Sequence, residues 1–125
     1  MKSPQIPEDF DRQALNRLNL ILDEFRKISP ELPMQQALTL LAIAAEPGLT
    51  LKEWARKVGV SEAALSRHVQ LLGTKIPGSK GKYGLVIANY DAVDTRKKVV
   101  TLTDKGRRTV ASLIDLINQI GRAHV

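Results

Sequence analysis

Hydrophobic side chains recur every three or four residues near the start of the chain, which is the spacing of one face of an α-helix. The pattern predicts a helix over residues 8–28, ended by Ser29-Pro30. A second helix is predicted over residues 33–46, where apolar residues occur on nearly all sides, and Pro47-Gly48 ends it. We therefore expect the second helix to be central to the core.

Two shorter helices with strong end signals follow. Thr50 and Glu53 have the spacing of a capping box, in which each side chain satisfies the other residue's free backbone N–H. Gly59 is expected to take the left-handed conformation that ends this helix, and Ser61 is expected to cap the next one. Two helices joined by so short a turn predict a helix-turn-helix over residues 50–72.

The apolar spacing then changes to that of β-strands. Residues 73–84 hold four glycines and a proline, which predicts a loop. Residues 85–102 hold two β-type runs around a polar turn, which predicts a hairpin. Beyond Thr103, which is placed to cap a helix, apolar residues recur at helical spacing over residues 104–120.

This order of elements predicts a mainly α fold with a small β-hairpin wing, a winged helix-turn-helix flanked by a helix at each end. The 125 residues are enough for one modest core. We predict a single domain over residues 8–120, with a flexible arm at residues 1–7 and a short tail at residues 121–125.

Composition excludes several classes of chemistry. The chain has no cysteine, and its two histidines, His68 and His124, are far apart in the sequence. We therefore expect no disulfide, no metal site, no thiol nucleophile and no cofactor. The sequence shows no Ser/His/Asp set, carboxylate cluster or phosphate-binding glycine loop, so we expect no catalytic residues. No apolar stretch is long enough to span a membrane and no signal-peptide core is present, which predicts a cytoplasmic location without a membrane partner.

Charge is unevenly distributed along the chain, whose net charge is +6. Residues 1–49 carry five basic and seven acidic side chains, and residues 109–125 carry one of each. Residues 50–108 carry thirteen basic and five acidic side chains, so the whole positive excess lies on the helix-turn-helix, the loop and the hairpin. Such asymmetry favours a surface that docks on a polyanion.

A helix-turn-helix suits double-stranded DNA because its second helix fits the major groove. Candidate contacts to base edges are Ser61, Glu62, Ala63, Ser66, Arg67 and Gln70. Candidate phosphate contacts are Thr50, Lys52, His68, Lys75, Lys80, Lys82, Lys97 and Lys98. The lysines of the loop over residues 73–84 either add phosphate contacts or have no role in binding.

The predicted wing carries Asp94 and Arg96 near its turn. An arginine at a wing tip suits the narrow minor groove, where the electrostatic potential is most negative. A carboxylate two residues earlier can hold that guanidinium in a fixed geometry. The alternative is an Asp–Arg pair that only closes the hairpin.

The residues from the wing into the last helix carry a resemblance to a known family. They read Asp94-Thr-Arg96-Lys-Lys-Val-Val100-Thr-Leu102-Thr103-Asp-Lys-Gly106. This segment resembles the D-x-R-x-x-x-V-x-L-T-x-x-G signature of the MarR-type (multiple antibiotic resistance regulator) winged-helix proteins. The resemblance covers roughly residues 33–120 and implies a homodimer that binds double-stranded DNA, usually as a transcriptional repressor. It also implies that Arg96 enters the minor groove and that Asp94 orients it.

Two features differ from the family pattern. The segment between recognition helix and wing is longer here, and one helix instead of two follows the wing. The flanking helices nevertheless carry more apolar residues than a small winged-helix core needs. The candidates for pairing across a two-fold axis are Leu15, Leu18, Leu22, Val110, Leu113, Ile117 and Ile120. The alternative is that both helices pack only on their own protomer.

Other functions fit the same elements. A winged-helix protein of this size is also compatible with plasmid or phage replication, partition or recombination, and a protein-binding winged helix is a third class. A salt-dependent affinity separates DNA binding from protein binding. An effector pocket is common in the resembling family, but no residue of this sequence identifies a small-molecule effector.

Overall fold

The computed structural model describes residues 9–74, 77–94 and 96–122, and within these it confirms the predicted fold class of helices with one antiparallel hairpin. In chain order the elements are α1 (Arg12–Arg26), α2 (Met34–Ala45), α3 (Leu51–Val58), α4 (Glu62–Leu72), β1 (Val86–Tyr90), β2 (Lys98–Leu102) and α5 (Asp104–Arg122). The predicted arm at residues 1–7 lies outside the described residues.

The ends of both flanking helices differ from the prediction, and the first helix ends at Arg26 instead of at residue 28. The first helix begins at Arg12, because the Asp11 side chain accepts hydrogen bonds from the backbone N–H groups of Gln13 (2.9 Å) and Ala14 (3.2 Å) and so caps the helix. The last helix continues through Arg122, so the first two residues of the predicted tail are helical.

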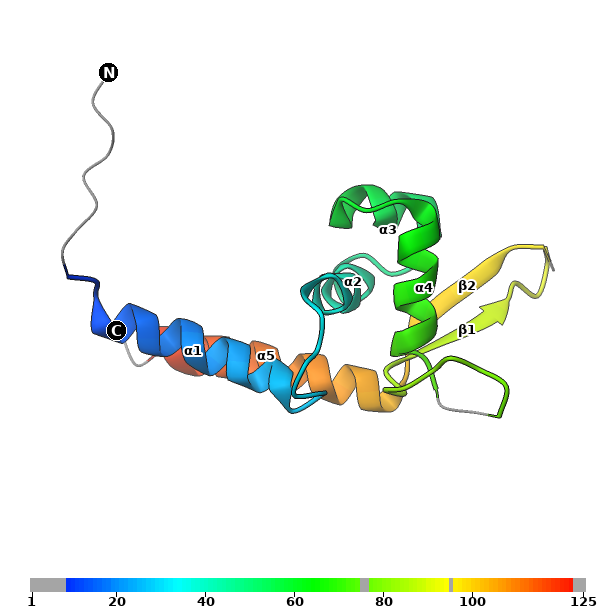
Figure 1. Cartoon of the computed structure of the whole chain (residues 1–125). Coiled ribbons are helices and arrows are strands. Elements are labelled where there is room, and N and C mark those ends of the chain that lie inside the picture. The colour runs from blue at the N-terminus through cyan, green and yellow to red at the C-terminus, as the bar shows by residue number, and fades with distance from the viewer. Residues whose placement is uncertain (1–8, 75–76, 95, 123–125) are drawn as a thin grey trace, which may run out of the picture.

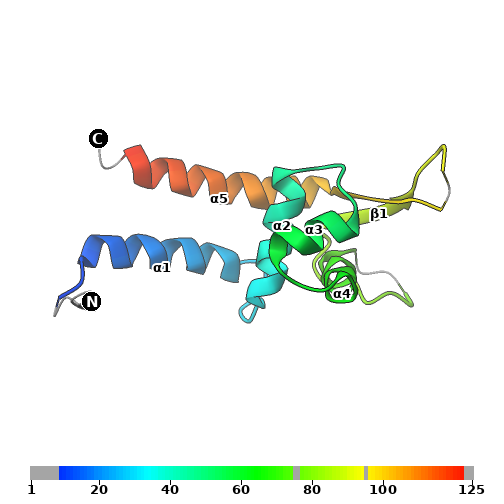
Figure 2. The same ribbon diagram turned by 90° about the horizontal axis from the view of Figure 1, so that it is seen from above.

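The molecule has a winged body and a long helical arm (Figure 1). Helices α1 and α5 contact each other and run in opposite directions, so both ends of the described chain lie at the far end of the arm. The view from above shows the hairpin pointing away from the body in the opposite direction (Figure 2). The arm therefore meets the body only at its base, where α1 ends and α5 begins.

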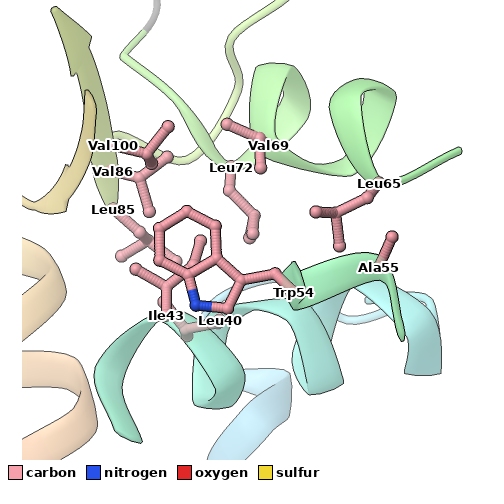
Figure 3. Close-up of a cluster of buried hydrophobic side chains, with 10 residues drawn as sticks. All are labelled: Leu40, Ile43, Trp54, Ala55, Leu65, Val69, Leu72, Leu85, Val86 and Val100. Carbon is pink, nitrogen blue, oxygen red and sulfur yellow. The ribbon is translucent and has the colours of Figure 1, made fainter. Parts of the chain in front are cut away.

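The core lies between α2, α3, α4 and the base of the hairpin (Figure 3). Trp54 is at its centre, and the indole N–H donates to the carbonyl oxygen of Glu46 at 3.0 Å. The buried hydrophobic cluster consists of Leu40, Ile43, Trp54, Ala55, Leu65, Val69, Leu72, Leu85, Val86 and Val100. Helix α2 supplies Leu40 and Ile43 and contacts α3, α4, α5 and β2, which confirms its predicted central place.

Local end signals fix the helix-turn-helix. Both halves of the predicted capping box are present: Glu53 N donates to Thr50 Oγ1 (3.1 Å), and Thr50 N donates to Glu53 Oε1 (3.2 Å). Gly59 ends α3 in the left-handed region with φ of +84°. Ser61 Oγ accepts from Ala64 N at 3.0 Å and caps α4. The angle between the two helices is then set by their shared core residues.

The hairpin joins α5 through a tight junction. Strands β1 and β2 pair antiparallel, with Val86 opposite Leu102 and Tyr90 opposite Lys98. The hydroxyl of Thr103 donates to the carbonyl of Gly84 (2.6 Å) and accepts from Gly106 N (3.0 Å). Thr103 N also donates to Leu85 O at 3.0 Å. The start of α5 is thus bonded directly to the segment that enters β1.

Candidate nucleic-acid interface

The outer face of α4 is polar and open to solvent. Leu65, Val69 and Leu72 point into the core, so the opposite face of the helix is available to a partner. Of the predicted base-contacting residues, Ser66 is half-buried and the others are exposed: Ser61, Glu62, Ala63, Arg67 and Gln70. No described carboxylate pairs with Arg67, so its guanidinium is free to bind a base or a phosphate.

His68 lies on another side of α4 and faces α2. Its Nε2 is 3.1 Å from Oε1 of Gln35, which identifies Nε2 as the donor, because an amide oxygen only accepts. Its Nδ1 is buried and has no hydrogen-bond partner among the described residues. The pKa of the imidazole is lowered from 6.5, first by burial and second by the charge of Arg67. The imidazole of His68 thus contacts α2, and its predicted role as a phosphate contact stays a prediction.

This environment makes stability depend on pH. Because the pKa of His68 is lower in the folded chain, the unfolded chain binds the proton more readily. The contribution of His68 is complete above about pH 6.5 and is lost as the pH falls through the folded-state pKa. We expect the free energy of unfolding to fall less between pH 7 and pH 5 in His68→Gln than in the wild type. Urea unfolding at both pH values measures this, and equal losses in the two proteins would contradict it.

The wing tip holds Arg96 fully in solvent. Its side chain is 92% exposed, and its Nε lies 3.4 Å from Oδ1 of Asp94. The same carboxylate oxygen accepts from the backbone N–H of Arg96 at 3.1 Å. Asp94 therefore restrains both the backbone and the base of the Arg96 side chain, and leaves the end of the guanidinium free.

Asp91, which the sequence did not single out, is a second residue that fixes the backbone at the tip of the wing. Its Oδ1 accepts from the backbone N–H groups of Val93 (2.7 Å) and Asp94 (3.2 Å). These two bonds, in that order, lower the pKa of Asp91, and Lys97 lowers it further. An aspartate at the first position of a turn was the available signal. Asp91 fixes the backbone on which Asp94 and Arg96 are carried.

The predicted phosphate contacts are distributed over three places. Lys52 is exposed on the first turn of α3, and Lys97 and Lys98 are exposed on the wing. Lys80 and Lys82 are exposed on the loop before β1, whereas Lys75 lies outside the described residues. The Thr50 hydroxyl donates to Glu53 Oε1 at 3.0 Å, so the capping box uses it.

The helical arm has an uncovered apolar surface. Helix α1 has no buried residue, although it carries leucines at helical spacing. Of the predicted pairing residues, Leu15, Leu18, Leu22 and Ile117 are about half exposed. Leu20 and Ile114 are equally exposed but were not predicted. For Ile114 the signal was its spacing of four residues from Val110.

Some of the residues predicted to pair across a two-fold axis are already packed within their own protomer. Leu113 is only 4% exposed, and Val110 packs against the core cluster. Ile120 is half-buried. Leu113 thus has almost no surface for a second copy, because α5 turns this side toward its own protomer.

Among the described residues, no three His, Cys, Asp or Glu side chains are grouped so that they could hold a metal ion. No helix in the same part of the chain is long and apolar enough to cross a membrane.

Comparison with known proteins gives matches among solved structures. No family model and no curated protein matches the sequence. A DNA complex of S. aureus MepR matches with a TM-score of 0.66 and 20% identity, over 90% of this chain and 82% of that chain. The PcaV transcriptional regulator from Streptomyces coelicolor matches with a TM-score of 0.56 and 25% identity, over 90% and 77%. A MarR transcriptional regulator from Methanosarcina mazei matches with a TM-score of 0.60 and 17% identity, over 90% and 73%.

The arrangement of a helix-turn-helix followed by a hairpin defines a winged helix-turn-helix protein. Within that class, the chain has the fold of the MarR-type regulators. The resemblance carried by the wing signature is therefore confirmed for the fold. The structure also explains three signature residues: Val100 is buried, Thr103 bonds the start of α5 to Gly84 ahead of β1, and Gly106 is buried where a Cβ would collide with the backbone of Leu85.

Proposed function

We propose that the protein is a sequence-specific, double-stranded-DNA-binding transcriptional regulator that acts as a homodimeric repressor. The observation that carries the proposal is the exposed polar face of α4 with the unpaired Arg67, together with the exposed Arg96 on the wing. Helix α4 enters the major groove and the tip of the wing enters the minor groove. The DNA complex of a protein with the same fold supports this assignment.

Dimerisation supplies the second half of the interface. The exposed leucines of α1 and the isoleucines of α5 lie on the arm, where they leave α4 and the wing free. A two-fold axis through the arms presents two α4 helices to successive major grooves, about 34–36 Å apart. The operator is then a pair of inverted half-sites.

The test is a selection of bound DNA from a random pool, followed by salt titration of the best binder. We expect two-fold symmetric half-sites and a plot of log K against log salt with a slope of about −5 or steeper, since six or more cations contact phosphates. Recovery of no preferred sequence, or an affinity that does not respond to salt, would overturn the proposal. Binding beside the protein's own promoter in the genome distinguishes repression from replication or partition.

Arg67→Ala is expected to weaken binding to the selected site by about 1–3 kcal/mol for each half-site and to relax the preference at one base pair of each half-site, because Arg67 reads a base edge in both protomers. Competition between the selected site and single-base variants of it measures both effects. Arg26→Ala is the matched control, since Arg26 is paired with Asp23 on α1 at 2.9 Å. Equal losses on all sequences would show that Arg67 contacts a phosphate instead.

A further inference from the structure

A groove of about 700 Å³ lies between the end of α4, the loop before β1 and β1 itself. Its apolar lining includes Val69 and Val86, and Gln70 and Asn89 line it from α4 and from β1. Lys80 of the loop and Lys98 of the wing also line it. The described lining contains no acidic side chain, so the groove is electrostatically suited to an anion.

The loop that forms one side of this groove is bonded to the body. Lys82 N donates to Leu71 O, and Gly84 N donates to Gly73 O, both at 2.9 Å. Gly81 is buried, and a Cβ at this position would collide with the backbone carbonyl of Thr74. These contacts hold Gly81 and Lys82 against the body and place Lys80, the preceding residue, beside the groove.

Lys80 and Lys98 are both exposed where they line the groove. Neither Lys80 nor Lys98 has a carboxylate partner in the part of the chain that the structure describes. Lys27 and Lys57, in contrast, are paired with glutamates at 2.8 Å and 2.5 Å. An unpaired lysine can replace a condensed counterion on a polyanion, whereas a paired one must first give up its carboxylate.

We infer that this groove holds the sugar-phosphate backbone of DNA, with Lys80 on one element and Lys98 on another contacting its phosphates. The inference rests on the proposed function. If α4 occupies the major groove and the wing the minor groove, the strand that separates these grooves passes between α4 and the wing. The groove lies between those elements and has cations on its lining. The described part of the loop, residues 77–84, is then a third contact, independent of base sequence.

The experiment compares Lys80→Gln, Lys98→Gln and the double variant with the wild type on the selected DNA site and on random DNA. Each dimer loses two phosphate contacts per substitution, so we expect the slope of log K against log salt to become shallower by about 1.8 for each lysine. At 0.15 M salt this corresponds to roughly a thirtyfold loss of affinity per substitution. The ratio of specific to random binding should stay unchanged, because these contacts read no base.

Lys27→Gln is the matched control, since it removes a lysine that is paired with Glu24 on α1. If the wild type binds DNA and Lys80→Gln leaves both slope and affinity unchanged, the inference fails while the proposed function stands. If the wild type binds no DNA but an acidic peptide binds it in a Lys80-dependent way, both fail. A changed preference among sites would also overturn the inference, because it would place Lys80 on a base.

Discussion

Leu18→Glu is expected to convert the protein into monomers and to lower its affinity for a two-fold symmetric DNA site by roughly a hundredfold or more. Leu18 is 54% exposed at the middle of α1, between the exposed Leu15 and Leu22. In a dimer that covers this stripe, a carboxylate would be buried without a partner, which opposes association. The monomer then binds each half-site separately, and the gain from joining two binding modules is lost.

Sedimentation or light scattering measures the state of the protein, and binding to a full site and to a half-site measures the effect on affinity. Leu20→Glu is the matched control: Leu20 is also about half exposed, but two residues along the helix place it on nearly the opposite side of α1. We expect Leu20→Glu to remain dimeric. A dimeric Leu18→Glu, or a monomer with undiminished affinity for the full site, would contradict the arm as the dimer interface.

The features that the sequence predicted well depend on neighbours a few residues apart. The capping box of Thr50 and Glu53, the left-handed Gly59 and the cap at Ser61 each involve residues within one helical turn or one short loop. Their backbone bonds form wherever those residues stand at that spacing. The helix-turn-helix and the side of α4 that faces outward could therefore be predicted from the sequence.

The features that it did not predict depend on residues far apart along the chain. His68 is positioned by Gln35, which is 33 residues earlier, so helical spacing alone could not show that its imidazole is packed against α2. Leu113 was assigned to the dimer because periodicity identifies an apolar stripe but not the surface that covers it. The groove beside Lys80 requires the loop, α4 and β1 to meet, which no local pattern encodes.

The wing signature contains a glycine whose role is visible only in the fold. Gly106 is buried in the first turn of α5, and a Cβ there would collide with the carbonyl oxygen of Leu85. The hydroxyl of Thr103 bonds both Gly106 N and Gly84 O, so this close approach belongs to the junction between α5 and the wing. A glycine inside a helix is unfavourable by itself, which makes the close approach the physical reason for its presence.

Gly106→Ala is therefore expected to lower the free energy of unfolding by about 3 kcal/mol, because the added methyl group forces α5 away from the backbone of Leu85. Gly121→Ala is the matched control in the same helix: its Cβ would meet no atom within 4 Å, and the exchange should stabilise the protein by up to about 1 kcal/mol. Urea unfolding at one protein concentration measures both, since a dimer's stability depends on concentration. If both variants became more stable, the junction would have room for a side chain at Gly106 and the contact with Leu85 would not constrain the wing.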